Sequence, residues 1–258
     1  MNSARKLILV TNDDGITAPG IKALVSEMQL LGEVVVVAPD SPQSGQGHAI
    51  TMNDPIRINK VNIFPGAEAY ECSGTPADCV KIAKNVILKN RRIDLCVSGI
   101  NHGSNASINI IYSGTMSAAM EASLEGINSI GFSLLDLSYK ANFDGARYYA
   151  RKIANEVLNK GLNGCRLLNV NFPSVPLNEI RGAKICRQAE GTWVEEFKEG
   201  IDPRGQKYYW LTGEFRLDDQ GDDHDLYALK NNYVSIVPSG HDLTSHEALP
   251  HLNHLEKI

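Results

Sequence analysis

Short runs of apolar residues, each bounded by polar residues or glycine, recur along the first two-thirds of the chain. Such runs are typical of buried β-strands, and the amphipathic segments between them predict helices. Strands and helices that alternate in this way predict an α/β fold with a mainly parallel sheet flanked by helices. The predicted strands span residues 6–11, 33–38, 56–63, 69–72, 93–98, 129–135 and 166–171, and the predicted helices span residues 21–31, 76–89, 116–120 and 144–159.

The pattern changes after about residue 173. Residues 208–210 and 234–237 are predicted strands of an antiparallel C-terminal excursion. The acidic stretch 218–225 lacks the alternation and terminal glutamate of a calcium-binding loop, so a solvated loop and a helix cap are favoured there. Neither an internal repeat nor a dividing linker is evident. We therefore expect a single domain over residues 1–258, with an excursion over about 174–258.

Composition and charge narrow the class of protein. The chain has 258 residues, 43% of them hydrophobic, and a net charge of -5, which argues against a nucleic-acid polymer or an anionic membrane as the main partner. The chain has five cysteines, an odd number, and no C-x-x-C pair, which argues against a disulfide framework and against a zinc ribbon. Reduced thiols in a cytoplasmic protein are therefore expected. The apolar run 7–10 is too short for a signal peptide, and a stretch of ~18 apolar residues, as a membrane helix needs, does not occur.

Three polar loops follow predicted strands, at residues 12–15, 43–48 and 98–105. The carboxyl ends of parallel strands meet at one edge of a sheet, and open α/β sheets bind their ligands there. We therefore expect these three loops to lie together and to form the functional site.

Asp13 and Asp14 are adjacent carboxylates in the first of these loops. One interpretation is a turn and a helix start, both of which aspartate suits. The other is a metal site, because two neighbouring carboxylates raise each other's pKa unless a cation is present. The Ser44 hydroxyl and the Asn101 amide are further oxygen donors nearby, and such a set suits magnesium, manganese or calcium.

Ser113, Gly114 and Thr115 open the alanine-rich predicted helix. They form a helix cap, and the free N–H groups of a helix start also bind phosphate, which Gly114 would allow to approach closely. The loops around the site contain neither Lys nor Arg, so a phosphate there needs a metal and a helix N-terminus to meet its charge. His48 and His102 are either solvated loop residues or donors of a proton to the leaving alcohol, and both interpretations stay open.

Seven motifs follow one another along the chain, at residues 11–15 (TNDDG), 44–45 (SG), 74–78 (GTPAD), 98–105 (SGINHGSN), 112–115 (YSGT), 210–214 (WLTGE) and 233–236 (YVSI). In this order and spacing they resemble the survival protein E (SurE) nucleotidase family. The chain departs from the family at one point: many members carry a basic residue shortly before the Ser-Gly pair, whereas residues 39–43 here contain none, which leaves the preferred substrate open.

This resemblance implies a Rossmann-like fold whose C-terminal excursion helps to build a homodimer or homotetramer. It implies hydrolysis of nucleoside 5′- and 3′-monophosphates, with polyphosphate ends cleaved by some members. The cofactor implied is one divalent ion, magnesium or manganese, with calcium as a substitute in crystals. The residues implied are the metal ligands Asp13, Asp14, Ser44 and Asn101, of which Asp13, Asp14 and Asn101 are also catalytic, and the substrate-binding residues Asn12, Gly45, His48, Asn105, Ser113, Gly114 and Thr115.

Three other functions compete with this one. A haloacid-dehalogenase-type phosphatase also places an aspartate after the first strand, but its mechanism needs a second aspartate two residues on, where Gly15 stands after Asp13. A non-catalytic nucleotide-binding module or half of a glycosyltransferase has no need of adjacent carboxylates beside a Ser–Asn pair. If Asp13 and Asp14 are ligands, water is the expected nucleophile, and the alternative is a phospho-aspartate route.

Overall fold

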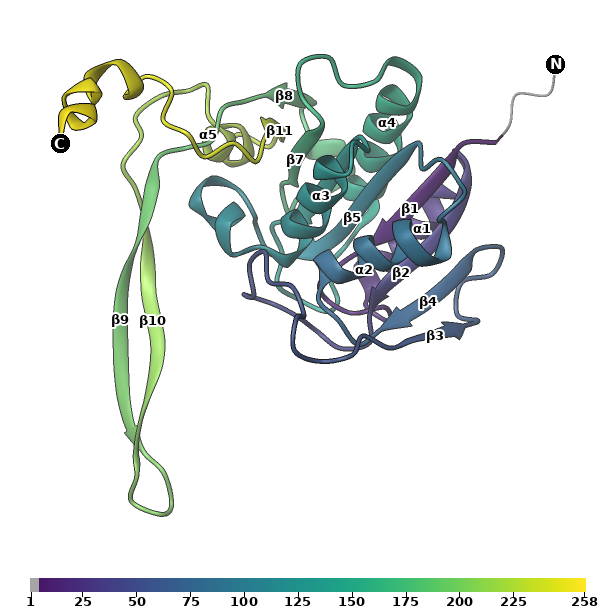
Figure 1. The fold of residues 1–258 in the computed structure, drawn as a ribbon, viewed down its shortest axis with the longest axis horizontal. Helices are drawn as coiled ribbons and strands as arrows, with labels where there is room; N and C mark the ends of the chain where they lie inside the picture. The colour runs from purple at the N-terminus through teal and green to yellow at the C-terminus, as the bar shows by residue number, and fades with distance from the viewer. Residues whose placement is uncertain (1–4) are drawn as a thin grey trace.

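The computed structural model describes residues 5–258 and places a nine-stranded sheet at the centre of the molecule (Figure 1). The strand order is β3-β4-β2-β1-β5-β6-β7-β11-β8, and neighbours run parallel except at the β3–β4 and β7–β11 pairs. The predicted α/β fold with a mainly parallel sheet is thus confirmed. The strands of this sheet are β1 (Leu7–Thr11), β2 (Glu33–Pro39), β3 (Ile58–Val61), β4 (Glu68–Cys72), β5 (Leu95–His102), β6 (Ser129–Leu134), β7 (Leu167–Phe172), β8 (Ala183–Ile185) and β11 (Val234–Ser239).

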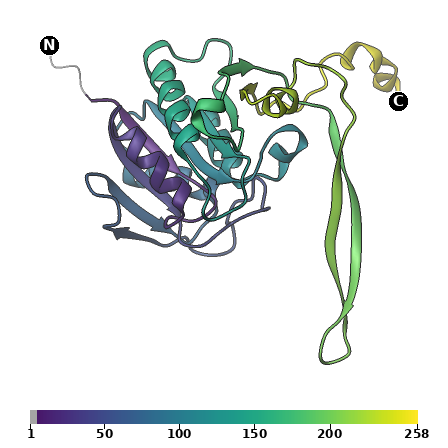
Figure 2. The same cartoon turned by 180° about the vertical axis from the view of Figure 1, so that it is seen from behind.

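Helices cover both faces of the sheet (Figures 1 and 2). Successive side chains of a strand point to opposite faces, so in β1 Ile8 and Val10 pack with α1 and α4, and Leu7 and Leu9 pack with α2 and α3. This burial on both faces explains why the strands are continuous apolar runs rather than alternating ones. The helices are α1 (Pro19–Met28), α2 (Pro76–Ile82), α3 (Gly114–Leu124), α4 (Asp144–Lys160) and α5 (Asp225–Lys230), with a π-helical turn at Ala83–Ile87 and 3-10 turns at Ser107–Tyr112, Leu177–Glu179, Leu249–His251 and Asn253–Lys257.

Two element boundaries differ from the expected ones in ways that bear on the site. The strand predicted to end at residue 98 continues as β5 to His102, because Asn101 and His102 pair with β6 after a break in register. Asn101 therefore lies on the end of a strand and not in a loop. The helix predicted over 76–89 keeps its capping box, in which Thr75 and Asp78 exchange hydrogen bonds, but its last part is the π-helical turn.

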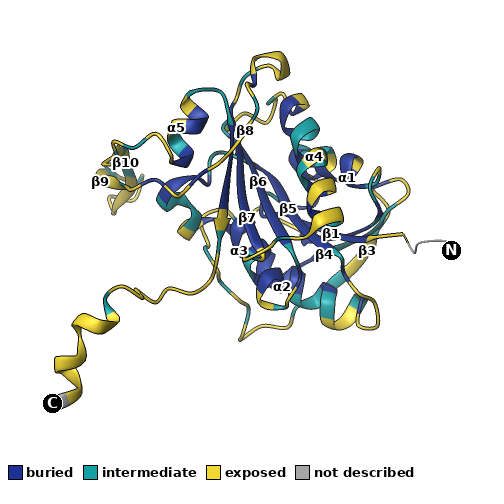
Figure 3. Cartoon of the chain, turned by 90° about the horizontal axis from the view of Figure 1, so that it is seen from above, coloured by how far each residue is buried: buried dark blue, intermediate teal, exposed yellow. Residues whose placement is uncertain are grey.

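The C-terminal part both rejoins the sheet and leaves it. β8 and β11 extend the sheet, whereas β9 (Gly191–Ile201) and β10 (Lys207–Leu217) form an antiparallel hairpin that projects away from the α/β body (Figures 1 and 2). The sheet is buried, while the hairpin and most of residues 240–256 are exposed (Figure 3). The expected antiparallel excursion is confirmed, although β9, β8 and α5 were not predicted.

The order of strands places a ligand site at β1. The chain passes from β1 to β2 on one side, and β5 pairs with β1 on the other, so the direction of winding reverses between β1 and β5. The crevice beyond the carboxyl ends of two such strands is where open α/β sheets bind ligands. Within residues 5–258, no helix is long and apolar enough to cross a membrane.

Candidate functional site

A cavity of about 670 Å³ lies beyond the ends of β1 and β5. Residues from all three loops expected at this edge line the cavity, and Ser113, the N-cap residue of α3, lines it too. Among the described residues that line it, none is Lys or Arg. Its lining residues are Asp13, Ser44, Gly45, Asn101, His102, Gly103, Ser104, Asn105, Asn109, Tyr112, Ser113, Leu135, Leu137 and Trp193.

Asp13 is the one carboxylate among the described residues that line the cavity, with an exposed fraction of 4%, and Asp14 does not line it. Burial raises the pKa of Asp13 to about 6, and the charge of Asp14 raises it too, while a hydrogen bond from the Thr115 hydroxyl lowers it. That hydrogen bond runs from Thr115 Oγ1 to Asp13 Oδ1. A carboxylate removed from water in this way favours a bound cation, which would offset the cost of its charge.

Gly114 lies directly against the Asp13 side chain. A Cβ atom at position 114 would be 2.7 Å from Asp13 Cβ and 3.0 Å from Asp13 Oδ2, closer than side chains pack. The glycine is therefore needed for the approach of Asp13 to the start of α3. The Ser113 hydroxyl accepts a hydrogen bond from Met116 N, which makes Ser113 the N-cap of this helix.

Asp14 and Asn101 each keep an oxygen without a partner among the described residues. Asp14 Oδ2 accepts a hydrogen bond of 3.2 Å from the backbone N–H of His102, and Asp14 Oδ1 accepts none from residues 5–258. Burial raises the pKa of Asp14, against the effect of this N–H. Asn101 Nδ2 donates to the Gly103 carbonyl at 2.9 Å, which leaves Asn101 Oδ1 as the oxygen available to a ligand.

Ser44 and Gly45 reach the cavity from an exposed loop. This loop is tied to the first one, because Gln43 N donates to the Asp13 carbonyl at 2.7 Å. Asn12 is buried and does not line the cavity, and its Nδ2 donates to the Gly15 carbonyl at 2.9 Å. The side chain of Asn12 thus holds the turn that presents Asp13 and Asp14.

Asn105 is fixed by an amide network that the sequence analysis missed. Asn105 Nδ2 donates to Ser133 Oγ at 2.8 Å, and Asn105 N donates to Asn171 Oδ1 at 2.9 Å. Asn169 Nδ2 in turn donates to the Asn105 carbonyl at 2.8 Å. Asn169 and Asn171 are buried polar residues in an otherwise apolar strand, LLNVNF, and that irregularity was the available signal.

The two histidines are placed differently. His48 does not line the cavity, and its Nε2 lies 3.0 Å from Oε2 of Glu121 on α3, which also pairs with Lys81. His102 does line the cavity, stacks on Tyr139 at 5.4 Å and meets Phe143 edge-on at 5.3 Å. Both ring nitrogens of His102 are buried without a hydrogen-bond partner in the described structure.

The oxygen donors at this site fit a hard divalent cation. Within residues 5–258, no group of three or more His, Cys, Asp or Glu side chains could hold a metal. Only two of the predicted ligands, Asp13 and Asp14, are side chains of these types. The other two ligands are the Ser44 hydroxyl and the Asn101 amide oxygen. Oxygen-only sets of this kind suit magnesium, manganese or calcium, whereas zinc and copper prefer nitrogen and sulfur.

The acidic stretch has a structural role. Asp219 and Asp223 pair with Arg187, whose guanidinium lowers the pKa of both carboxyl groups. Asp225 is fully buried at the start of α5 and accepts hydrogen bonds from Ser107 N and Ala189 N. The expected loop and helix start are therefore present, and Asp225 ties them to the segment before α3.

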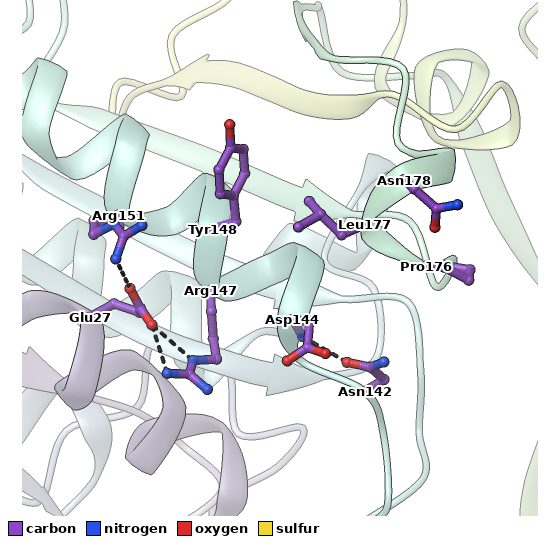
Figure 4. Close-up of a pocket in the computed structure, with 9 residues that line it drawn as sticks. All are labelled: Glu27, Asn142, Asp144, Arg147, Tyr148, Arg151, Pro176, Leu177 and Asn178. Atoms are coloured by element: carbon purple, nitrogen blue, oxygen red, sulfur yellow. Dashed lines mark hydrogen bonds and ion pairs between the residues drawn. The ribbon is translucent and has the colours of Figure 1, made fainter.

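A second cavity, of about 610 Å³, lies beside α4 and the segment after β7 (Figure 4). The buried Glu27 carboxylate of α1 points toward Arg147 and Arg151 of α4, at 2.8 Å and 3.0 Å. These ion pairs join α1 to α4. The cavity contains none of the predicted site residues, so we assign the functional site to the cavity at β1 and β5.

Comparisons with known proteins agree on one family. The family described as Survival protein SurE matches residues 8–195. The chain is 57% identical to the 5'-nucleotidase SurE of Flavobacterium psychrophilum over 251 residues, covering 97% of each protein. It is 56% identical to the 5'-nucleotidase SurE of Cytophaga hutchinsonii, covering 97% of this chain and 96% of that protein.

A solved structure gives the same result for the fold. The SurE protein from Aquifex aeolicus superimposes with a TM-score of 0.84 at 38% sequence identity. The match covers 97% of this chain and 99% of that one, so it includes the C-terminal part as well as the α/β body.

Proposed function

Because this chain belongs to the survival protein SurE family, we propose that it is a 5'-nucleotidase that hydrolyses nucleoside monophosphates to nucleoside and phosphate. The observation that carries the proposal is the composition of the cavity at β1 and β5. Carboxylate, amide and hydroxyl oxygens meet a helix start there, and none of its described lining residues is Lys or Arg. A site of this kind binds a phosphate through a cation and backbone N–H groups.

Asp13, Asp14, Ser44 and Asn101 are the proposed metal ligands. The support is that Asp13 and Asp14 follow β1, that Asn101 ends β5, and that Ser44 reaches the same cavity. When bound, a divalent ion would lower the pKa of a water molecule and neutralise charge on the phosphoryl oxygens. Magnesium or manganese is the ion we propose for the protein in solution.

The start of α3 is proposed to bind the phosphate. Its first N–H groups have no preceding turn to bond with, and the helix dipole favours an anion at that end. Ser113 lines the cavity, whereas Thr115 is fully buried and its hydroxyl is engaged with Asp13. We therefore assign Thr115 to the positioning of Asp13, whose pKa is lowered by hydrogen bonds from both the hydroxyl and the backbone N–H of Thr115. Asn105 and Gly45 stay proposed substrate contacts, because both line the cavity.

Water is the proposed nucleophile. Asp13 is 4% exposed and held between Thr115 and Gly114, so its carboxylate has little freedom to attack a phosphorus atom in line. Ser44 is committed as a ligand in this scheme. His102 lines the cavity and is the better placed of the two histidines to give a proton to the leaving alcohol, since His48 is paired with Glu121 outside it.

A phosphate-release assay on AMP tests this function. Treatment with a chelator is expected to abolish release, and added manganese or magnesium is expected to restore it. Acid quenching during turnover should trap no phosphoenzyme. Full activity in a metal-free preparation would refute the metal site, and a trapped aspartyl phosphate would refute attack by water.

Two finer points belong to the same proposal. The exposed aromatic residues of the β9–β10 hairpin support assembly into a homodimer or homotetramer, because unpaired apolar surface of this kind marks interfaces. All five cysteines are free thiols, which supports the cytoplasm as the compartment.

A further inference from the structure

The substrate-sized cavity has a second kind of lining besides its oxygen donors. Tyr112, Leu135, Leu137 and Trp193 also line it, and none of them was expected at the site. A phosphate needs only the oxygen donors and the helix start. The remainder of a nucleotide, its sugar and its base, needs a surface of a different character, which these four side chains provide.

Trp193 comes to the cavity from β9, at the base of the hairpin. Its indole Nε1 donates a hydrogen bond of 2.9 Å to Asn109 Oδ1. On the neighbouring strand, Phe215 is its partner in register and meets the indole edge-on, with ring centroids 5.7 Å apart at 76°. The ring is thus fixed by two contacts, yet 41% of the residue is exposed. An aromatic ring held in this way can stack on a ligand without losing side-chain freedom.

The indole is also fixed relative to the phosphate end of the cavity. Asn109 belongs to the 3-10 turn Ser107–Tyr112, which leads directly into Ser113, the N-cap of α3. That turn is anchored at Ser107, whose N–H donates to Asp225 Oδ2 at 2.8 Å and whose hydroxyl donates to the Ala189 carbonyl at 2.9 Å. The hydrogen bond between Trp193 and Asn109 therefore sets the indole at a defined place beside the helix start.

We infer that Trp193 is the surface on which the nucleobase of the substrate stacks, and that it makes the enzyme select nucleotides by the stacking area of the base. This inference rests on the proposed nucleotidase function. Every base has a π-face, so stacking tolerates all of them and favours the larger purines. A charged side chain beside Trp193 could select one base by hydrogen bonds to its edge. Among the described residues that line the cavity, the carboxylate is that of Asp13, at the end assigned to the phosphate.

The kinetic test compares substrates with and without a base. Trp193→Ala is expected to raise the KM for AMP by roughly fivefold or more, the range that loss of one base–aromatic contact gives elsewhere, while kcat changes little. Its kcat/KM for ribose 5-phosphate should stay within about twofold of the parent. Trp193→Phe should recover most of the affinity for AMP, and the parent's preference for AMP over CMP should shrink in Trp193→Ala.

Trp210 supplies the matched control. It lies on the same hairpin, is 67% exposed and does not line the cavity. Trp210→Ala should leave the KM for AMP unchanged, even if it alters assembly of the protein. An equal loss on AMP and ribose 5-phosphate in Trp193→Ala, or no loss on AMP, would overturn the inference.

A binding measurement separates this inference from the function on which it rests. The chain contains two tryptophans, so Trp210→Phe leaves Trp193 as the only indole. Adenosine, added without metal, should quench the fluorescence of that variant, whereas ribose should not. Failure of the parent to hydrolyse any nucleotide would refute the nucleotidase function, but adenosine quenching would still show that Trp193 contacts a base. An unchanged spectrum with adenosine would overturn the role of Trp193.

Discussion

The contact between Gly114 and Asp13 joins the proposed metal ligand to the proposed phosphate-binding helix. The sequence alone accounts for the glycine by the close approach of a phosphate to the helix start. The structure adds a different reason, since a Cβ atom there would lie 2.7 Å from Asp13 Cβ. Any side chain at position 114 would therefore displace the carboxylate as well as crowd the anion.

Gly114→Ala is accordingly expected to weaken metal binding and catalysis together. We expect kcat/KM to fall at least a hundredfold, about 2.7 kcal/mol of transition-state stabilisation. Isothermal titration with manganese should show a lower affinity in the same variant. Ser123→Ala, a change of similar size at the other end of α3, is the control and should alter neither quantity.

A Gly114→Ala variant with normal manganese affinity and a hundredfold loss of activity would mean that the methyl group blocks only the phosphate. A variant that keeps both, within about threefold of the parent, would show that the contact with Asp13 relaxes without consequence and that residues 113–115 act only as a helix cap.

At the scale of elements, the β9–β10 hairpin carries apolar residues that the rest of the chain leaves uncovered. Phe197 and Leu211 face each other in register, at 65% and 62% exposed. Trp210, the preceding residue of β10, is 67% exposed on the opposite face of the ribbon. A two-stranded ribbon has no core of its own, so these side chains need another surface to bury them.

The double variant Phe197→Ser/Leu211→Ser is expected to dissociate the proposed homo-oligomer. The side chains lie on the same face of the ribbon because directly opposed residues share a face, and serine removes the apolar area without breaking the backbone pairing. Light scattering at micromolar concentration should report a smaller mass than for the parent. Glu195→Gln, elsewhere on β9, serves as the control. A monomeric parent, or an unchanged mass in the double variant, would contradict assembly through the hairpin.

The strands that could be predicted from the sequence are those whose own apolar residues favour a buried strand. The apolar runs of β1, β2 and β6 are buried on both faces and were placed within a residue or two. β9 was missed because most of its residues are exposed, so it has no apolar alternation, and it forms by pairing along its whole length with β10. Asn101 was assigned to a loop because its strand continues only through contacts with β6.

At the scale of the whole molecule, the proposed cation would link folding to binding. The proposed ligands come from three separate segments, after β1, after β2 and at the end of β5, and an unfolded chain does not hold them together. A ligand that binds only the folded state stabilises it by about 2.7 kcal/mol at a concentration 100 times its Kd.

Manganese at that concentration is therefore expected to raise the Tm by roughly 5–10 °C over the chelated protein, given about 2–4 °C per kcal/mol for a chain of this size. Scanning calorimetry measures this without any substrate. Asp13→Asn should abolish most of the increase, and Asp94→Asn, far from the cavity, should keep it. Equal Tm values with manganese and with chelator would speak against a metal site in the folded protein.

The site as a whole was only partly accessible from the sequence. The three polar loops and Ser113 were expected together and do line one cavity, because the direction of parallel strands determines which loops meet. Trp193 and the amides of Asn169 and Asn171 reach the site through pairings between distant segments. A local pattern of residue types does not encode such pairings.

The hydrogen bonds of Ser107 also have a consequence for the order in which the protein is made. Synthesis proceeds from the N-terminus, so Asp13, Ser44 and Asn101 leave the ribosome early and the α/β body can begin to form on the nascent chain. The partners of Ser107 are Ala189 and Asp225, which emerge much later. A ribosome-bound chain thus lacks the full anchor of the turn beside α3 until residue 225 has emerged, so loops synthesised before residue 106 are completed as a site only by residues made after position 188.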